Sequence, residues 1–426
     1  MKSCGTALAA CLLVLTANCA PRALAGEQVL VRHSREGEFA PRWREGRFEY
    51  GEDGVRHWIR GTTPGDGTIA LLATRTPYDP PFDFRGRFLQ FEVKVEDMSR
   101  LNGMEFRLSS DGLHSDYYSF GVPVFSDAAT NLLMSGEWQT LSFSFGSASV
   151  TGKPDRSRID SIGWVLRDNA DVSGARPLVA WWSKLSAVDE APRAVVSLTF
   201  DDGYDEHYQI AAPLLAKHGF RGTAYVMPDQ VGLPGYMSLA QLHELRDRHG
   251  WDIAAHPFNA LTDFAPDALE ALMKRTRGWL EAEGFGHGAR HLAYPLGKQE
   301  PFTVVPLARR FFDTARVASA GPETLPPGDR YRLRAVNVTK DTTPDAIRAA
   351  VRRARENHEW LILMFHWLVE EPEWITQYAI GDFRRALQVI DEEGIAVLPV
   401  SQVWGEISAP AAAPRAPDSP VPAPAR

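Results

Sequence analysis

The hydrophobic rhythm of this chain changes once, near Pro192, and that change limits the folds available to it. Before this point apolar and polar residues alternate, as they do at Leu89, Phe91, Val93 and Val95. A period of two is typical of a strand that buries one face. After it, apolar runs of strand length are followed by stretches with helical spacing. We therefore predict an all-β part followed by an α/β part.

The first part, residues 26–190, contains many short alternating runs separated by Gly, Asn, Asp and Pro. This pattern predicts a β-sandwich of the jelly-roll kind. The stretch Gly136–Trp138 and the closing run Val179–Trp182 loosely resemble carbohydrate-binding sandwiches. Four aromatic residues are candidates for stacking on sugar rings, although we expect most of them in the core: Tyr117, Tyr118, Trp181 and Trp182.

The second part, residues 193–406, alternates between strands and helices. This alternation predicts a parallel sheet, and so many repeats favour a closed or nearly closed β/α barrel. The expected strands are 195–200, 222–227, 251–255, 291–294, 360–365 and 395–399, and the expected helices are 207–218, 239–249, 266–283, 344–357 and 380–393.

The first 25 residues have the pattern of a signal peptide. A positive charge at Lys2 precedes an apolar run over 7–17, and Ala23–Ala25 offers a cleavage site before Gly26. We therefore expect an exported protein, periplasmic or secreted, with a lipid anchor at Cys19 as the alternative. All three cysteines lie in this segment, so the mature chain would have neither a disulfide nor a thiolate metal site.

Composition narrows the partners further. The formal charge of -8 argues against nucleic acid, because no excess of basic residues is present to hold phosphates. No apolar run is long enough to span a bilayer, so we expect no transmembrane segment. Residues 407–426 are mostly Pro and Ala and are expected to be a disordered tail.

Two adjacent carboxylates, Asp201 and Asp202, directly follow the first strand of the α/β part. The carboxyl ends of barrel strands face the active site. Neighbouring carboxylates repel each other unless a cation or a proton separates their roles. A metal bound by one would leave the other free to act as a base. The alternative is an ordinary Asp- and Gly-rich turn.

Three later strand ends supply matching residues. His256 follows the third expected strand, Tyr294–Gly297 ends the fourth, and His366 follows the fifth. Each alone has an ordinary structural explanation, as a satisfied histidine or a simple turn. Because all of them fall at the same end of a parallel barrel, we expect them to form one site.

These segments resemble, in order, the motifs of the polysaccharide deacetylases of carbohydrate esterase family 4, over about 194–404. The resemblance implies a distorted seven-stranded TIM-like barrel and a divalent metal, zinc being favoured. The implied roles are Asp201 as general base, His366 as general acid, Asp202 and His256 as metal ligands, the Leu296 backbone N–H as an oxyanion donor, and Tyr294 and Trp367 as further substrate-binding residues.

Two departures from the family pattern stand out. The family's second metal-binding histidine would fall four residues after His256, where this chain has Ala260. Asn259, Asp263 or a water molecule are the substitutes we consider. The residues that normally orient the general-acid histidine have no clear match, and Asp341 and Trp367 are the candidates.

The expected function is removal of N-acetyl groups from an extracytoplasmic polysaccharide by a metal-dependent hydrolase. One alternative is a degenerate barrel that grips glycan without hydrolysing it, because the metal site lacks a ligand. The other is a deacetylase that acts on O-acetyl esters, since the same groups can cleave either bond.

Overall fold

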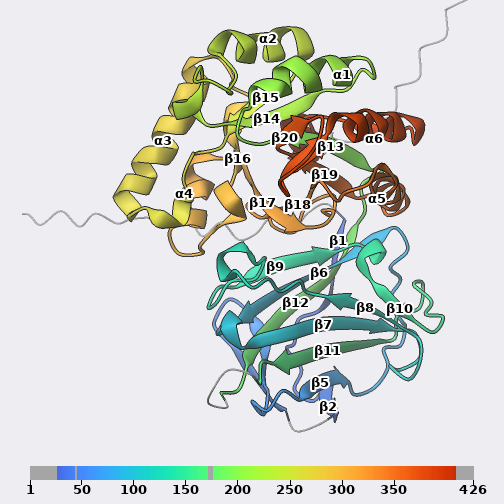
Figure 1. Cartoon of the computed structure of the whole chain (residues 1–426). Helices are drawn as coiled ribbons and strands as arrows, with labels where there is room; N and C mark the ends of the chain where they lie inside the picture. The colour runs from blue at the N-terminus through green and yellow to red at the C-terminus, as the bar shows by residue number, and fades with distance from the viewer. Residues whose placement is uncertain (1–25, 44–45, 171–175, 409–426) are drawn as a thin grey trace, which may run out of the picture.

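The computed structural model describes residues 26–43, 46–170 and 176–408, which form two bodies packed against each other (Figure 1). An antiparallel β body comes first in the chain and an α/β body follows. Within these residues no helix combines the length and the apolar character needed to cross a membrane.

Both ends of the chain carry predictions that fall outside this description. The predicted signal peptide, 1–25, lies outside the described residues, and so does the predicted tail from 409 onward. Residues 407 and 408, which we assigned to that tail, instead end the last helix, α7 (Val400–Ser408).

The β body consists of two antiparallel sheets, each with six strands among the described residues. From β4 to β12 each strand lies in the other sheet from the strand before it, except that β8 follows β7 and β11 follows β10 within the second sheet. The body is therefore a β-sandwich, as predicted from the sequence. The first sheet has the order β3 (Arg47–Glu52), β4 (His57–Thr62), β12 (Val179–Asp189), β6 (Arg87–Val95) and β9 (Gln139–Phe143), with β1 (Glu27–Val31) beside β12. The second has the order β10 (Ser149–Thr151), β8 (Tyr117–Gly121), β7 (Leu101–Ser109), β11 (Ser161–Asp168), β5 (Ile69–Thr74) and β2 (Phe39–Trp43).

Aromatic rings fill the space between these two sheets. The ring of Phe91 on the first sheet lies 3.5 Å from that of Phe106 on the second, and Trp164 packs edge-on against Phe106 at 3.9 Å. Trp182 is fully buried in the same core, as expected. The other three aromatic residues proposed for sugar stacking, Tyr117, Tyr118 and Trp181, are only partly buried, which corrects the expectation that most of them lie in the core.

The α/β body is a closed barrel of seven parallel strands, as predicted. Its first and last strands are buried along their whole length, because helices cover one face and the barrel interior the other. Around the ring the strands are β13 (Val195–Phe200), β14 (Gly222–Val226), β15 (Asp252–Ala255), β16 (His291–Ala293), β17 (Thr314–Ala320), β18 (Leu333–Asn337) and β19 (Trp360–Phe365), which pairs again with β13.

Helices surround this barrel (Figure 1). Local signals explain their ends: Ser238 and Gln241 form a capping box at the start of α2, and Gly250 ends it with φ of 66°. Every predicted helix forms. The helical segments are η4 (His207–Ala211) continuing into α1 (Ala212–Ala216), α2 (Leu239–His249), α3 (Pro266–Ala282), α4 (Val304–Phe311), α5 (Pro344–Glu356) and α6 (Ile380–Glu392).

The α/β body differs from the expected elements in several places. Strands β17, β18, β20 (Trp367–Val369) and β21 (Gln377–Ala379) and helices α4 and α7 were not predicted. The expected strand 395–399 shrinks to β22 (Ala396–Val397), which pairs with β13 outside the closed ring. Each missed strand of the closed ring carries a buried arginine, Arg316 in β17 and Arg334 in β18. Charged residues are usually exposed, so these two segments were not predicted as buried strands.

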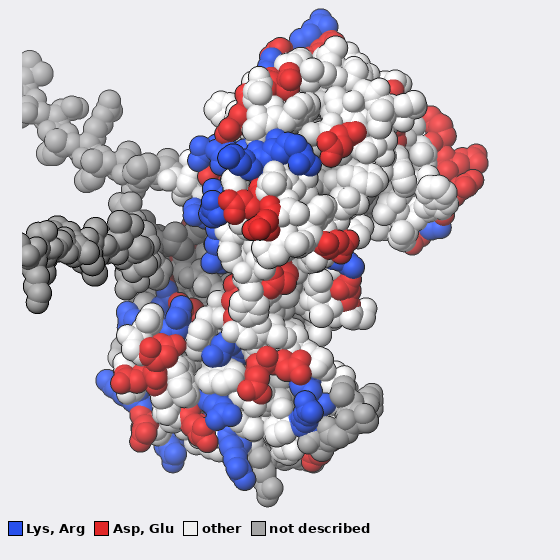
Figure 2. Space-filling model, turned by 90° about the vertical axis from the view of Figure 1, so that its left-hand side faces the viewer, with Lys and Arg blue, Asp and Glu red and all other residues white. Residues whose placement is uncertain are grey.

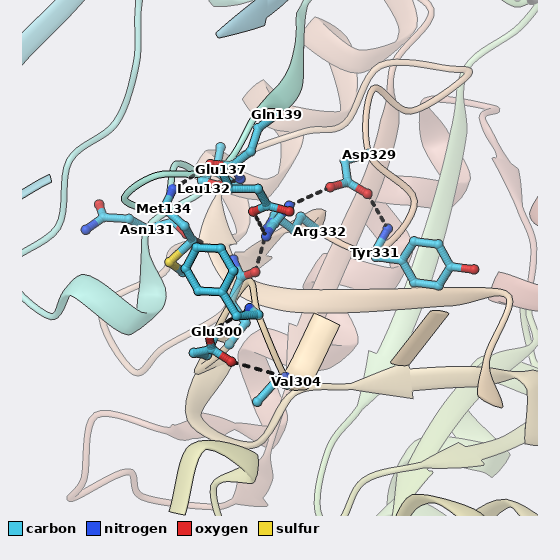
Figure 3. A network of polar contacts seen from close by, with 12 residues as sticks. Asn131, Leu132, Met134, Glu137, Gln139, Glu300, Val304, Asp329, Tyr331 and Arg332 are labelled. Atoms are coloured by element: carbon cyan, nitrogen blue, oxygen red, sulfur yellow. Dashed lines mark hydrogen bonds and ion pairs between the residues drawn. The ribbon is translucent and has the colours of Figure 1, made fainter. Parts of the chain in front are cut away.

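The two bodies meet through buried polar contacts beside strand β9. Ser142 and Thr324 share a hydrogen bond of 2.5 Å across the interface. Arg332 of the barrel donates to Glu137 of the sandwich at 2.6 Å and to Asp329 at 2.8 Å (Figure 3). The first body is therefore fixed to the barrel and not merely tethered to it. On the face of the sandwich that Figure 2 shows, acidic and basic side chains lie interspersed.

Candidate active site

The first carboxylate of the site belongs to a buried ion pair. Asp201 follows the last residue of β13, and Arg316 of β17 donates through Nη2 to both of its oxygens at 2.6 Å. The side chains are 5% and 1% exposed. Nη1 of the same guanidinium donates to the Val317 carbonyl at 3.0 Å. The carboxylate is thus held in one orientation, by a residue that sequence reasoning missed.

The second carboxylate faces a histidine from the neighbouring strand end. Oδ1 of Asp202 lies 3.3 Å from Nε2 of His256. The other ring nitrogen, Nδ1, lies 3.0 Å from the Ala293 carbonyl, which can only accept, so Nδ1 carries a proton. Asp202 has φ of 74°, a left-handed conformation that is strained for a residue with a side chain. Gly203 continues the turn with φ of 82°.

Opposite charges set the protonation of this pair. Burial alone would raise the pKa of Asp202, but the hydrogen bond from His256 and the charges of His256 and His366 lower it to about 2. Burial alone would lower the pKa of His256, but Asp202 and Asp201 outweigh it and raise that pKa. The pair therefore favours a negative carboxylate facing a positive partner.

His366 directly follows β19 and joins the same cluster. Burial lowers its pKa, against the opposing effect of Asp201 and Asp202. Its backbone carbonyl lies 2.8 Å from Nε2 of the buried His207, while its own Nδ1 has no hydrogen-bond partner among the described residues. The structure thus brings Asp201, Asp202, His256 and His366 together at one end of the barrel. The two candidates for orienting His366 do not reach it: Asp341 is exposed, and Trp367 makes ring contacts elsewhere.

The segment after β16 forms a tight turn at the same rim. Leu296 has φ of 58° and a side chain that is 71% exposed. Gly297 also has positive φ, and a Cβ there would lie 2.7 Å from the Ala318 side chain, so only glycine fits. Tyr294 is 2% exposed and its hydroxyl is buried. Its N–H donates to the Arg316 carbonyl and its carbonyl accepts from the Gly297 N–H, so its substrate-binding role stays a prediction.

The sandwich holds the residues that follow this turn. The Gln299 N–H donates to the Ala129 carbonyl at 2.9 Å, and its side-chain amide donates to the Asn131 carbonyl at 2.9 Å. Nε of Arg332 in turn donates to the Gln299 side-chain oxygen at 2.5 Å. The turn that carries Leu296 is therefore buttressed by the other body, which the sequence did not indicate.

Aromatic side chains line the opposite edge of the cluster. The ring of Trp367 lies 4.6 Å from that of Tyr204 and 5.6 Å from that of Trp374, which is 61% exposed. Tyr236 stacks on the other side of Tyr204 at 5.4 Å. Flat apolar rings beside a polar cluster suit a sugar ligand.

The position of the missing metal ligand is held by a buried alanine. Ala260 is 7% exposed and precedes the short turn Leu261–Asp263, while Asn259 and Asp263 are exposed. Within the described residues, no group of three or more His, Cys, Asp or Glu side chains could hold a metal ion. Two ligands of one tetrahedral zinc ion lie roughly 3.4 Å apart. The 3.3 Å between Asp202 and His256 therefore fits two corners of such a site.

Residues 189–309 match the family model "Polysaccharide deacetylase". These residues belong to the polysaccharide deacetylase family. The putative polysaccharide deacetylase YxkH of Bacillus subtilis (strain 168) is 24% identical over 158 residues, which cover 37% of this chain. The chain thus spans about half the length of that relative, 56% of it.

Solved structures show fainter likenesses. The Streptococcus pyogenes deacetylase PplD in complex with acetate is 22% identical, with a TM-score of 0.32 over 36% of this chain and 69% of that one. A family 11 carbohydrate-binding module from Clostridium thermocellum is 12% identical, with a TM-score of 0.29 over 39% of this chain and 98% of that one. The barrel topology is established by the strand pairings of this chain and not by these likenesses.

The family match covers only part of the site. It includes Asp201, Asp202, His256 and the turn around Leu296, and it ends before β17. The barrel geometry, and not the family match, places Arg316 and His366 beside these residues.

Proposed function

We propose that this protein is a metal-dependent hydrolase that removes N-acetyl groups from a polysaccharide outside the cytoplasm. One observation carries the proposal: a fixed carboxylate, a carboxylate–histidine pair and a second histidine share one barrel rim. The extracytoplasmic location is supported only by the signal-peptide pattern of residues 1–25.

Asp202 and His256 are the residues that would hold the cation, with the remaining positions left to water and substrate. Their oxygen and nitrogen donors suit zinc, which would polarise a water molecule and the acetyl carbonyl when bound. The hydrogen bond from His256 to the Ala293 carbonyl directs Nε2 toward that position.

Asp201 is the proposed general base. Arg316 occupies part of its oxygen surface, and the remaining lone pairs can accept a proton from the attacking water. The oxygen of that water adds to the acetyl carbon, and the backbone N–H of Leu296 stabilises the oxyanion that forms.

His366 is the proposed general acid. It donates a proton to the amide nitrogen as the carbon–nitrogen bond breaks, which leaves acetate and a free amino sugar. Burial lowers its pKa, so the protonated form gives up its proton readily. The sugar ring would be held beside His366 by four aromatic residues, Tyr204, Tyr236, Trp367 and Trp374.

The same groups could cleave an O-acetyl ester. A second alternative is a barrel that binds glycan with weak or no turnover, because no third protein ligand for the metal is found within the described residues. Measurements of acetate release separate these possibilities. The substrates are an N-acetylglucosamine polymer and an O-acetylated glycan, each with and without a chelator. We expect chelator-sensitive release from the first polymer.

Variants test the assigned roles. Asp201→Asn and His366→Ala should each lower acetate release by about 100-fold or more, since general acid–base catalysis contributes 10²–10⁴-fold. Glu356→Gln, at an exposed position at the end of α5, is the control. Wild-type rates in either variant would remove its role from the proposal.

A further inference from the structure

A row of tryptophans and cations crosses the outer face of the first sheet. Arg60 on β4 pairs with Trp181 on β12, which pairs in turn with Lys94 on β6. Trp138 directly precedes β9, whose Gln139 pairs with Val93, so Trp138 falls opposite Lys94. At about 4.8 Å between neighbouring strands, the row extends about 14 Å.

The members of this row touch one another. Nζ of Lys94 lies 4.2 Å from the ring centre of Trp181 and 5.4 Å from that of Trp138. The guanidinium of Arg60 lies 5.7 Å from the Trp181 ring, and that of Arg56 lies 5.3 Å from the Trp138 ring. All five side chains are partly exposed, so solvent reaches the row.

Charge in the row is only partly balanced. Arg56 pairs with Glu92 at 2.9 Å, and Arg60 pairs with Glu49 at 3.2 Å. Lys94 forms no ion pair with any carboxylate in the described part of the chain. Asp53 lies near Arg56 and Lys94, whose charges help to lower the pKa of its carboxyl, but it forms no ion pair with Lys94. The Lys94 ammonium lies between two indole rings.

The row also adjoins the barrel. Trp138 follows Glu137, which binds Arg332 across the interface at 2.6 Å (Figure 3). One residue earlier, a Cβ on Gly136 would lie 3.6 Å from the ring of Phe302, which is 69% exposed. Phe302 in turn follows the turn that carries the exposed Leu296. The exposed side chain of Phe302 therefore comes shortly after Leu296 in the sequence and lies close to Gly136 in space.

We propose that this row binds the polysaccharide chain whose acetyl group enters the barrel, and that this polysaccharide carries carboxylate groups. The inference rests on the proposed function for its substrate. Sugar rings contact the exposed parts of the Trp138 and Trp181 side chains, and a sugar carboxylate pairs with Lys94 between them. A cation on an exposed aromatic face is held only weakly, so the Lys94 ammonium remains available to a ligand.

Binding of the full-length protein to hyaluronan, a polymer of alternating glucuronate and N-acetylglucosamine, tests the inference by affinity electrophoresis or calorimetry. Lys94→Glu and Trp181→Ala should each weaken binding about tenfold or more, and added salt should weaken binding by the wild-type protein. The matched control is Lys153→Glu, the same charge change at an exposed position just after β10 of the second sheet. Melting temperatures of all variants exclude unfolding as the cause.

Unchanged binding in both row variants would overturn the inference, and so would an equal loss in the control. Equal, salt-independent binding to glycol chitin, a neutral N-acetylated polymer, would overturn its acidic part. Acetate release by the wild-type protein from a short N-acetylglucosamine oligomer reports separately on the proposed function. If that release is absent while the row variants lose hyaluronan binding, the proposed function fails and the binding surface stands.

Discussion

At the scale of single residues, the site depends on what holds each reactive group in place. The Asp201 carboxylate receives two hydrogen bonds from one nitrogen of Arg316, and both side chains are buried. A buried ion pair costs desolvation energy when it forms, so it is weak evidence for a purely stabilising role. Its value here is geometric, because it leaves the carboxylate only one orientation.

Replacement of Arg316 by lysine therefore separates charge from geometry. Arg316→Lys keeps the positive charge but loses the planar, multi-donor group that fixes Asp201. We expect kcat for acetate release to fall by about 10-fold or more with a smaller change in KM, as for an interaction made in the transition state. A parallel melting curve should show a folded protein. A kcat within twofold of wild type would show that the orientation of Asp201 does not depend on this arginine.

The metal site offers a test by gain of function. Ala260 is the position at which the resemblance places a third ligand, and it is buried. Ala260→His should raise the affinity for zinc by about 10-fold or more, because a third protein ligand completes the common catalytic set. Competition with a chromogenic chelator measures this change. The exposed neighbour provides the control in Asn259→His, and an equal gain there would argue against a specific third position.

At the scale of elements, the helices could be predicted because their ends carry local signals. Ser238 with Gln241, and Gly250, mark the two ends of α2 in the sequence itself. Strands β17 and β18 could not be predicted, since Arg316 and Arg334 break their apolar runs. Each arginine is buried only because a distant carboxylate meets it, Asp201 in one case and Glu323 in the other. The folded barrel brings each carboxylate to its arginine, and the sequence around the arginine does not indicate this partner.

The turn after β16 is an element supported from outside the barrel. Gln299 accepts from Arg332 and donates to the Asn131 carbonyl, and both contacts are buried. Gln299→Leu would leave a buried guanidinium N–H without its acceptor, at a cost of about 1–3 kcal/mol. We expect a lower melting temperature together with slower acetate release, because the Leu296 N–H loses its fixed position.

A surface contact of the same turn provides the control for that change. Lys298 pairs with Asp127 at 3.1 Å, and both side chains are substantially exposed. Lys298→Ala should change stability by less than about 1 kcal/mol, as exposed ion pairs do. If the two variants behave alike, the buried contacts of Gln299 do not position the turn.

At the scale of the whole molecule, the change of rhythm near Pro192 was enough to predict two bodies and their fold classes. Their contact was not predictable, because it joins Asn131 and Glu137 to Gln299 and Arg332, more than 160 residues away. The candidate catalytic cluster was largely predictable, since parallel strands bring their carboxyl ends together. The residues that orient it came only from the structure.

Each body buries a histidine that resists protonation, which makes global stability depend on pH. Burial lowers the pKa of His33 in the sandwich to about 3 and that of His291 in the barrel to about 4. Both are 2% exposed. In the unfolded chain both titrate near 6.5, so the unfolded state binds more protons as the pH falls below that value. Stability should therefore be lost between pH 6.5 and about 4, by about 1.4 kcal/mol per pH unit for each histidine.

Replacement of one of these histidines should make stability fall less steeply as the pH is lowered. His33 packs against Phe39 at 5.2 Å and Trp164 at 5.9 Å, and its ring nitrogens have no hydrogen-bond partner among the described residues. Phenylalanine can therefore replace it without stranding a polar group. Urea unfolding from pH 7 to pH 4.5 should show a slope for His33→Phe that is smaller by about 1.4 kcal/mol per pH unit. His114→Phe, at an exposed position, should keep the wild-type slope, and an unchanged slope in His33→Phe would mean that His33 does not stay neutral in the folded protein.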